Sequence, residues 1–328
     1  MDNTQELQPN DINILKPENF KNNVDDLSGD DIIEEETKDN TSELPLGDVL
    51  STSDAYSNIT AKENSTFIAL AGPSGCGKTT LLTAIYQLFQ KGAVENYYFA
   101  GSETLLGFEQ RAYLTRLHSG QLVPDTPKTR RGADQLLHIK IWDSYADKFF
   151  NLLISDFSGE DYSNIKANPE YAKSDFGIIK SAKCFVVILD GDLILNKEQR
   201  NSTLKDATEL LRTFADADLL RSDASIIVAI SKYDIVKKRY ADDPSLYDYE
   251  EYIKNRFNAI AKPLNKEILY TNVSAISDSE VDYNERSLND MLRNWIDSSN
   301  NNHKYSYHEP GIMKSQFNCF CRKQRMVL

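Results

Sequence analysis

Cysteine is scarce in this sequence, and the four that are present do not form a disulfide framework. They stand at positions 76, 184, 319 and 321 of 328 residues. None has a second pair at the spacing of zinc ligands, so neither a zinc site nor a disulfide-rich secreted domain is predicted. We expect reduced thiols and a cytoplasmic setting.

Long apolar runs are absent as well. The sequence has no stretch of about 18 apolar residues, which a membrane-spanning helix needs, and no signal-peptide pattern. Residues 317–328 combine Cys319 and Cys321 with basic and apolar residues, so they are candidates for acylation or for contact with an anionic membrane. No cysteine stands four residues from the last residue given, so we expect no prenylation box. We favour a frayed C-terminal extension over residues 301–328.

The sequence also lacks an excess of basic residues. The net charge is −13, and residues 1–60 alone carry 15 Asp and Glu against 3 Lys. These residues include the acidic run 30–36 and have no sustained apolar period, which is typical of a disordered acidic tail. A short Ile- and Leu-containing segment in this tail is a candidate for folding on a partner. The remaining chain is close to neutral, so we expect no binding to nucleic acid.

A complete phosphate-binding motif is present. Residues 72–79 match G-x-x-x-x-G-K-[ST] at every fixed position, between an apolar run at 66–71 and a helical pattern at 80–89. The glycines let the backbone aim its N–H groups at a phosphate chain, and the helix adds the positive end of its dipole. Lys78 can reach the β- and γ-phosphates, and the Thr79 hydroxyl can bind Mg²⁺. The predicted phosphate-binding residues are Gly72, Gly75, Cys76, Gly77, Lys78, Thr79 and Thr80.

Strand and helix patterns alternate along the chain, which predicts an α/β sheet. The continuous apolar runs at 183–190 and 224–230 are typical of parallel strands that are buried on both faces. We predict one domain over residues 61–300, with a long insertion at about 92–135. Further strands are expected near 65–71, 136–142, 151–156 and 267–273, and helices near 78–91, 103–118, 197–217, 247–262 and 287–297.

Two further motifs are candidates for binding the phosphates and the base of a nucleotide. Both follow predicted strands, at the edge where open α/β sheets bind ligands. Asp156 can hold the Mg²⁺ shell through water, and the backbone N–H of Gly159 can meet a γ-phosphate. Asp234 can accept two hydrogen bonds from the N1–H and amino group of guanine, a pair of donors that adenine does not offer. The stem of Lys232 can lie over the base plane.

A last motif follows the strand expected at 267–273. There a backbone N–H at Ser274 or Ala275 can bind the guanine O6. None of these short motifs is specific alone, but each stands on its own strand in the order phosphate loop, D-x-x-G, S-K-x-D and S-A.

In this order the motifs resemble those of the TRAFAC class of P-loop GTPases, over about residues 64–300. The segment 99–111, with the Pro- and Thr-rich stretch before Leu136, is similar to the double-GTPase families of prokaryotic conflict systems. The resemblance implies a mostly parallel six-stranded sheet with helices on both faces. It also implies GTP or GDP with Mg²⁺ as ligands, and a protein partner that acts as a sensor or effector.

The sequence departs from the GTPase pattern at two positions. Ser231 opens the base-reading motif where Asn or Thr is usual, and its shorter side chain is expected to lower the affinity for guanine. Glu160 stands where Ras-like enzymes carry the glutamine that orients the attacking water. Its carboxylate can orient water as a base, although its charge close to the γ-phosphate can slow the reaction.

The resemblance further implies a first switch with a Mg²⁺-binding threonine shortly before the strand at 136–142. Thr126 and Thr129 are the candidates, and we favour Thr129 as a metal ligand beside Thr79 and Asp156. Arg130 and Arg131 follow directly. We assign Arg130 as a candidate arginine finger in cis, and the alternative is a solvated basic pair.

Three functions remain open at this point. The first is a Mg²⁺-dependent GTPase that acts as a molecular switch, with Lys78, Glu160 and Arg130 as its catalytic residues. The second is a GTP-binding interaction module with little or no hydrolysis, which Glu160 favours. The third is a P-loop ATPase or nucleotide kinase. ATPases of the other major P-loop branch usually carry a catalytic acid directly after the Mg²⁺-binding Asp, and Phe157 at that position argues against an ATPase.

Overall fold

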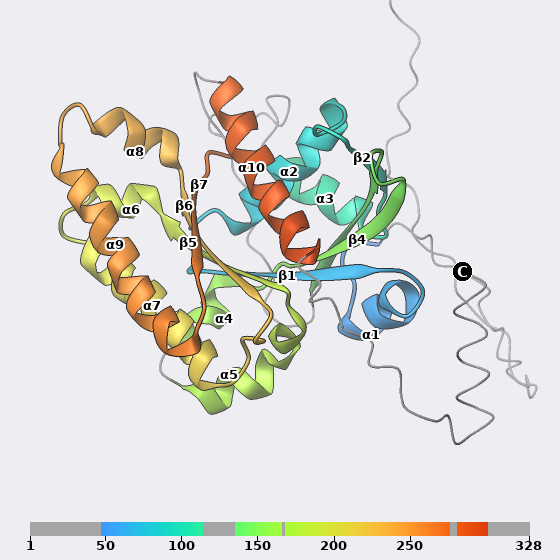
Figure 1. Cartoon of the computed structure of the whole chain (residues 1–328), viewed down its shortest axis with the longest axis horizontal. Helices are drawn as coiled ribbons and strands as arrows, with labels where there is room; N and C mark the ends of the chain where they lie inside the picture. Colours follow the sequence, from blue (N-terminus) through green and yellow to red (C-terminus); the bar gives the residue numbers. More distant parts are fainter. Residues whose placement is uncertain (1–46, 114–134, 166–167, 276–280, 301–328) are drawn as a thin grey trace, which may run out of the picture. The chain divides into compact units, whose positions relative to one another are not determined.

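The computed structural model describes residues 47–113, 135–165, 168–275 and 281–300, which form an α/β domain (Figure 1). Its sheet has seven strands in the order β2-β3-β4-β1-β5-β6-β7. The neighbours from β4 to β7 are parallel, whereas β3 pairs antiparallel with both β2 and β4. The strands are β1 Ser65–Ala71, β2 Tyr97–Gly101, β3 Leu136–Asp143, β4 Lys148–Ser155, β5 Cys184–Asp190, β6 Ser225–Ser231 and β7 Ile268–Asn272.

Helices cover both faces of the sheet. Side chains of α2, α3 and α10 pack on one face, and those of η1, α4, α5, α7, α8 and α9 pack on the other. The main helices are α2 Lys78–Lys91, α3 Leu105–Ala112, α7 Arg200–Asp216, α9 Ser245–Ala261 and α10 Val281–Asn300. The shorter ones are α1 Thr52–Asp54, η1 Ala55–Thr60, α4 Gly159–Asn164, α5 Pro169–Asp175, η4 Gly177–Ser181, α6 Gly191–Leu195, α8 Tyr233–Arg239 and η5 Lys262–Leu264.

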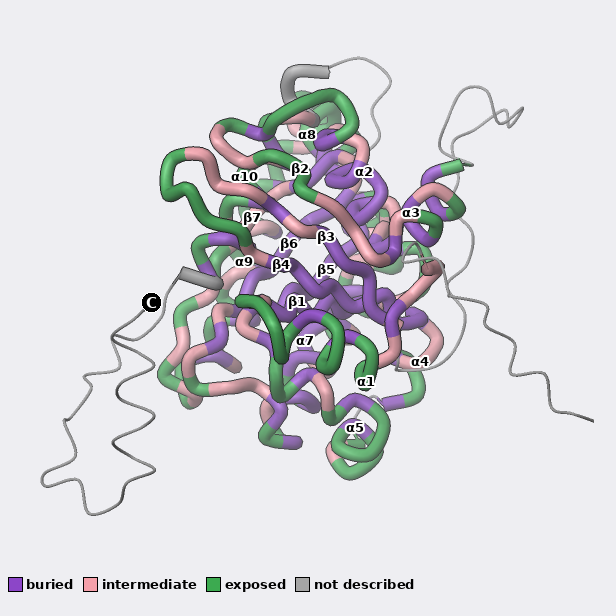
Figure 2. Tube along the Cα trace, turned by 90° about the vertical axis from the view of Figure 1, so that its right-hand side faces the viewer, coloured by how far each residue is buried: buried purple, intermediate pink, exposed green. Residues whose placement is uncertain are grey.

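The two packed faces follow from the alternation of side chains along each strand. In β1, Phe67 and Ala69 belong to the cluster under α7 and α9, whereas Ile68 and Leu70 belong to the cluster under α2 and α10. All seven residues of β5 are buried, as its continuous apolar run predicted. Figure 2 shows the same concentration of buried residues along the central strands. The loop that follows β1 therefore starts from a strand that is held on both sides.

The structure adds one strand to the six that the resemblance implied. β2 lies in the segment predicted as an insertion and pairs with β3 at the edge of the sheet. Its sequence, Tyr-Tyr-Phe-Ala-Gly, contains strand-favouring aromatic residues, but the run is short, ends in glycine and does not alternate between apolar and polar positions. The helix expected at 103–118 is described as α3, over Leu105–Ala112.

Residues 47–60, which the sequence assigned to the acidic tail, pack against this domain. Leu50 forms an antiparallel bridge with Leu136, with N–O distances of 2.9 and 3.0 Å. Ala55 and Ile59 are buried in the cluster under α7 and α9. Three apolar anchors in an acidic stretch give no periodic pattern, and only their tertiary contacts show that they belong to the core. Residues 1–46 and the C-terminal extension 301–328 lie outside the described residues.

His138, on β3, is buried in a hydrogen-bonded network. Its Nδ1 accepts from the backbone N–H of Glu103 at 2.9 Å, and its Nε2 lies 2.9 Å from Asn151 Oδ1. The Asn151 amide in turn donates to Glu63 and to the backbone carbonyl of Asn64. Because Nδ1 accepts, the ring is neutral and carries its proton on Nε2. Burial lowers the pKa of His138, and the hydrogen bond to Asn151 offsets part of this effect.

We expect His138 to make the folded state less stable at mildly acidic pH. The unfolded chain takes up a proton with the ordinary histidine pKa of about 6.5, whereas the folded protein resists protonation until the pH is lower. The free energy of unfolding should therefore fall as the pH drops below about 6.5, by about 1.4 kcal/mol for each unit by which the pKa is lowered. Denaturant unfolding of wild-type and His138→Gln chains between about pH 7.5 and 5 measures this slope. The His138→Gln variant should show a weaker dependence of the free energy of unfolding on pH than wild type. Equal slopes in the two proteins would contradict the prediction.

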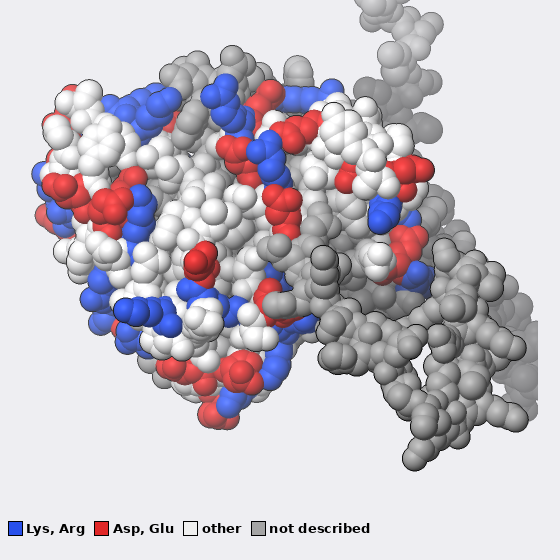
Figure 3. Space-filling view, in the orientation of Figure 1, with Lys and Arg blue, Asp and Glu red and all other residues white. Residues whose placement is uncertain are grey.

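Charged side chains of both signs are interspersed on the face shown in Figure 3. Elsewhere among the described residues, charged side chains form pairs at the surface, such as Lys91 with Glu285 at 2.6 Å and Lys140 with Glu63 at 2.7 Å. Exposed pairs of this kind contribute little to stability, so the fold rests mainly on its two apolar clusters. Within the described residues, no helix is both long and apolar enough to cross a membrane.

Candidate nucleotide-binding site

The four sequence motifs lie at the carboxyl ends of four strands. The phosphate loop follows β1, Asp156 follows β4, residues 231–234 span the end of β6 and the start of α8, and Ser274 lies just beyond β7. Because β4, β1, β5, β6 and β7 are parallel neighbours, these ends meet at one edge of the sheet. The structure therefore brings together residues that are far apart in the sequence, at the edge where ligands bind in open α/β sheets.

The phosphate loop depends on glycine for its shape. Gly75 and Gly77 have φ values of +79° and +94°, a left-handed conformation that side chains disfavour. At Gly72 the limit is space, because a Cβ there would lie 2.7 Å from Cys76 Sγ and 2.9 Å from the Ile188 carbonyl oxygen. Gly77 is also the N-cap residue of α2, so the loop leads directly into a helix N-terminus. This is the geometry of an anion cradle.

Cys76 turns its thiol into the core. The residue is 1% exposed. Burial raises the pKa of the thiol, and the nearby Lys78 ammonium opposes this only in part. A buried thiol of this kind is a poor nucleophile, so the side chain acts as a small packing group.

Lys78 is held inside the loop. Its Nζ donates to the backbone carbonyls of Gly72 and Pro73 at 2.8 and 3.0 Å, and it lies 5.8 Å from the centroid of the Tyr162 ring. The Tyr162 hydroxyl donates to the Leu70 carbonyl at 2.6 Å, which fixes the ring in place. No sequence motif marks this position on α4, so the place of Tyr162 beside Lys78 could not be predicted.

Thr79 and Asp156, two of the predicted metal ligands, are in contact. Thr79 Oγ1 donates to Asp156 Oδ1 at 3.2 Å, and Asp156 is 1% exposed. Within the described residues, no group of three or more His, Cys, Asp or Glu side chains is arranged to hold a metal. Mg²⁺ commonly takes only one or two protein oxygens and completes its shell with phosphates and water, so this pair fits that ion.

A buried arginine contacts the same carboxylate. Arg111 Nε donates to Asp156 Oδ2 at 2.6 Å, and its Nη1 donates to Asp48 Oδ1 at 2.8 Å and to the Gly107 carbonyl at 3.0 Å. Burial opposes the charge, but the carboxylates of Asp156 and Asp48 more than compensate and raise the pKa of Arg111. No spacing rule links a helix before β3 to the end of β4, so the contact of Arg111 with Asp156 could not be predicted from the sequence.

Gly159 lies directly against the phosphate loop. A Cβ at this position would be 2.2 Å from the backbone nitrogen of Ser74 and 2.5 Å from the carbonyl carbon of Pro73. The side chain of Ser158 caps α4 by accepting from the N–H of Glu160 at 3.2 Å. Glu160, the candidate for orienting water, is therefore in the first turn of α4, where it is half-buried.

The two base-reading motifs contact each other. The backbone N–H of Asp234 donates to Ser274 Oγ at 2.9 Å, and Ser274 is fully buried. Asp234 Oδ1 is buried but has no hydrogen-bond partner among the described residues. An unpaired buried carboxylate oxygen is costly, so the arrangement points to a donor that a ligand supplies.

Ser231 and Lys232 connect this region to neighbouring strands. Ser231 Oγ donates to the Leu189 carbonyl at 3.1 Å, and a Cβ on Gly77 would lie 3.6 Å from Ser231 Cβ. Lys232 adopts a left-handed conformation with φ of +51°, and its Nζ pairs with Asp190 Oδ2 at 2.7 Å. The pair fixes the lysine ammonium at the carboxyl end of β5.

Four of the predicted residues lie outside the described part of the chain: Thr126, Thr129, Arg130 and Arg131. Thr80 and Ala275 are described and half-buried, and Ala275 packs against the cluster that contains α10. The roles assigned to all six stay predictions.

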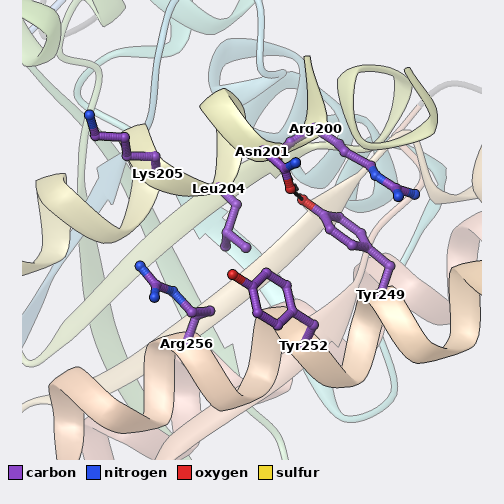
Figure 4. A pocket seen from close by; sticks show the side chains of 7 residues that line it. All are labelled: Arg200, Asn201, Leu204, Lys205, Tyr249, Tyr252 and Arg256. Atoms are coloured by element: carbon purple, nitrogen blue, oxygen red, sulfur yellow. Dashed lines mark hydrogen bonds between the residues drawn. The ribbon is translucent and has the colours of Figure 1, made fainter. Parts of the chain in front are cut away.

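A groove of about 310 Å³ lies apart from these motifs, between α7 and α9 (Figure 4). Its walls include the basic side chains of Arg200, Lys205 and Arg256. The Tyr249 hydroxyl donates to the Arg200 carbonyl at 2.8 Å, and the Arg200 guanidinium lies 4.5 Å from the centroid of the same tyrosine ring. None of the predicted nucleotide-binding residues lines this groove.

Comparison with known protein families finds one family whose model matches this chain. The model of the family described as Double-GTPase 2 (DO-GTPase2) matches residues 66–296, which is more than half of the chain and includes all four motifs. A search of curated proteins finds no match.

Proposed function

The chain belongs to the Double-GTPase 2 family, and from this premise we propose that it is a Mg²⁺-dependent molecular switch that binds and hydrolyses GTP. The family membership confirms the resemblance drawn from the motifs and supports a GTP-binding, GTPase-like function in general. The observation that best supports the proposed GTP-specific switch is the buried Oδ1 of Asp234, which has no hydrogen-bond partner among the described residues. It lies at the same sheet edge as the phosphate loop, where a nucleotide that occupied the loop would present its base.

Base selection rests on the Asp234 carboxylate. It would accept hydrogen bonds from N1–H and the 2-amino group of guanine, which satisfies the orphaned oxygen. Adenine presents an acceptor at N1 and no 2-amino group, so its binding would leave the carboxylate buried and unpaired. A site with unpaired buried polar groups rejects the wrong ligand strongly. The Lys232 stem and the backbone at Ser274 and Ala275 would complete the base pocket.

Phosphate binding rests on the loop and on Lys78. Its ammonium would exchange the carbonyls of Gly72 and Pro73 for β- and γ-phosphate oxygens, with the loop N–H groups around them. Thr79 and Asp156, with Thr129, are the residues that would hold Mg²⁺. When bound, this ion supplies neutralisation of the β- and γ-phosphate charge.

Hydrolysis would depend on orientation and charge. Glu160 would accept a hydrogen bond from the attacking water, and Lys78 and Arg130 would stabilise negative charge on the transferring phosphoryl group. Gly159 and Thr129 would be ordered by contact with the γ-phosphate and its Mg²⁺, and hydrolysis would release both segments, which gives the switch its two states. We further propose that a protein effector reads these states in the cytoplasm, through the segment 92–135 or the acidic residues 1–46.

A GTP-binding module with little or no hydrolysis is the second candidate. Glu160 favours it, because a carboxylate close to the γ-phosphate opposes the attack of water on an anionic centre. A P-loop ATPase is the third candidate, and it requires that Asp234 does not read guanine.

Titration of the full chain with fluorescent GDP, GTP and ATP analogues, with and without Mg²⁺, tests the proposal. We expect a guanine preference of about a hundredfold or more, because adenine leaves Asp234 unpaired. Equal binding of both bases would favour the ATPase. Single-turnover hydrolysis of bound GTP then separates the switch from the module, since the module would hydrolyse GTP no faster than water alone does.

A further inference from the structure

Three charged groups form a chain from the predicted metal site to the surface. Asp156 has a fully buried side chain, the Arg111 side chain is 10% exposed, and the Asp48 side chain is 36% exposed. Arg111 bridges the two carboxylates through different nitrogens, Nε to Asp156 and Nη1 to Asp48. One buried cation is therefore shared between the metal-site carboxylate and an acidic residue of the N-terminal segment.

The N-terminal residues 47–50 lie in close contact with α3, which carries Arg111. The backbone N–H of Gly47 donates to the Glu103 carbonyl at 2.8 Å. A Cβ at Gly107 would lie 1.7 Å from the Asp48 carbonyl oxygen, so only glycine permits this approach. The position of Asp48 relative to Arg111 is thus determined by backbone contacts.

We propose that Arg111 is a positioning residue that sets the Mg²⁺ affinity of the nucleotide site, and that Asp48 tunes this effect from the N-terminal segment. The inference rests on the proposed function. Arg111 holds Asp156 Oδ2 while Thr79 holds Oδ1, so it fixes the carboxylate in one orientation. Its positive charge also competes with Mg²⁺ for that carboxylate and repels the ion.

The sign of each effect follows from the charges. Removing the Arg111 charge removes a competitor for Asp156, so Mg²⁺ binds more tightly. Removing the Asp48 charge leaves Arg111 with one carboxylate instead of two, which strengthens its hold on Asp156 and weakens Mg²⁺ binding. The Arg111 effect is the larger, because its pair with Asp156 is buried and poorly screened, whereas Asp48 is partly exposed.

The test is the Mg²⁺ concentration that half-maximally slows release of a fluorescent GDP analogue from the full chain. We expect Arg111→Gln to lower this concentration about tenfold or more, as the loss of a close buried charge does. Asp48→Asn should raise it by about two- to fivefold, as for a partly exposed pair. Both variants break the contact between Arg111 and Asp48, so opposite shifts in Mg²⁺ dependence cannot come from a general loss of stability.

Matched controls come from a second Arg–Asp pair. Arg221 Nε lies 2.7 Å from Asp223 Oδ1 in the turn before β6, at the opposite edge of the sheet from the motifs. Arg221→Gln and Asp223→Asn change the net charge identically and should leave the Mg²⁺ dependence unchanged. Arg111→Lys keeps the charge and should stay closer to wild type than Arg111→Gln, which guards against a variant that folds poorly.

The outcomes separate the two proposals. Shifts in the same direction, or no shift, in variants that still bind GDP would overturn the role of Arg111 and Asp48 and leave the proposed function standing. Failure of the wild-type chain to bind any guanine nucleotide would overturn the proposed function and this inference with it.

Discussion

Replacing Asp234 with Asn is expected to reduce GTP affinity by about a hundredfold or more, which corresponds to about 2.7 kcal/mol. Asn presents an amide that offers one acceptor and two donors, so it cannot accept from both N1–H and the 2-amino group of guanine. The backbone N–H of Asp234 makes the contact with Ser274, and the substitution leaves that contact in place. Competition between guanine and adenine nucleotides for a fluorescent GDP analogue measures the change.

A rescue experiment distinguishes base reading from damage to the fold. Xanthine carries a carbonyl oxygen where guanine carries its 2-amino group, so the Asn amide can donate to it. Xanthosine triphosphate should therefore bind the Asp234→Asn variant better than GTP does, and bind wild type worse. If the GTP-to-ATP preference is unchanged in the variant, residues 231–234 form an ordinary strand-end turn.

The second large effect is expected at Gly159. A methyl group at Gly159→Ala would lie 2.2 Å from the Ser74 nitrogen, so either the phosphate loop or the start of α4 must move. Overpacking of this kind typically costs about 1–3 kcal/mol, because rigid backbone atoms cannot yield as a flexible side chain does. We expect a lower thermal midpoint and a loss of nucleotide affinity that is larger for GTP than for GDP, since Gly159 N–H is assigned to the γ-phosphate. Thermal unfolding and nucleotide titration of the same variant check both parts.

Gly177→Ala is the matched control for Gly159→Ala. Gly177 begins the short helix η4, and a Cβ there would meet no heavy atom within 4 Å. The control should keep wild-type affinity and stability. A Gly159→Ala protein that behaves like this control would show that the close approach to Ser74 is not needed for the site.

The phosphate loop and the order of the motifs could be predicted from the sequence, because both are local patterns. The turn at 72–79 needs glycine where φ is positive, and the apolar run at 183–190 needs two packed faces. Each requirement is met by residue types that are adjacent in the chain. The family match over residues 66–296 confirms that these patterns were assigned to the correct class of protein.

The strand β2 and the packing of residues 47–60 could not be predicted in the same way. β2 is a short edge strand whose residues are exposed or half-buried, and it pairs with β3 through backbone hydrogen bonds that leave no distinctive side-chain pattern. Leu50 reaches its place through a bridge to Leu136, a residue that is distant in the sequence. Acidic composition alone therefore placed the domain boundary at residue 60, although the packed chain begins earlier.

The fold class, the phosphate loop and the guanine-reading candidate can be read from residue types alone, since each depends on the spacing of residues within one strand, loop or helix. Three features emerge only when the chain is folded: Arg111 bridges Asp156 and Asp48, Tyr162 lies beside Lys78, and Gly159 has no room for a side chain. These contacts join elements that no local pattern links. They arise because parallel strands bring distant segments to one edge of the sheet, where charges and backbone atoms meet at distances that only packing determines.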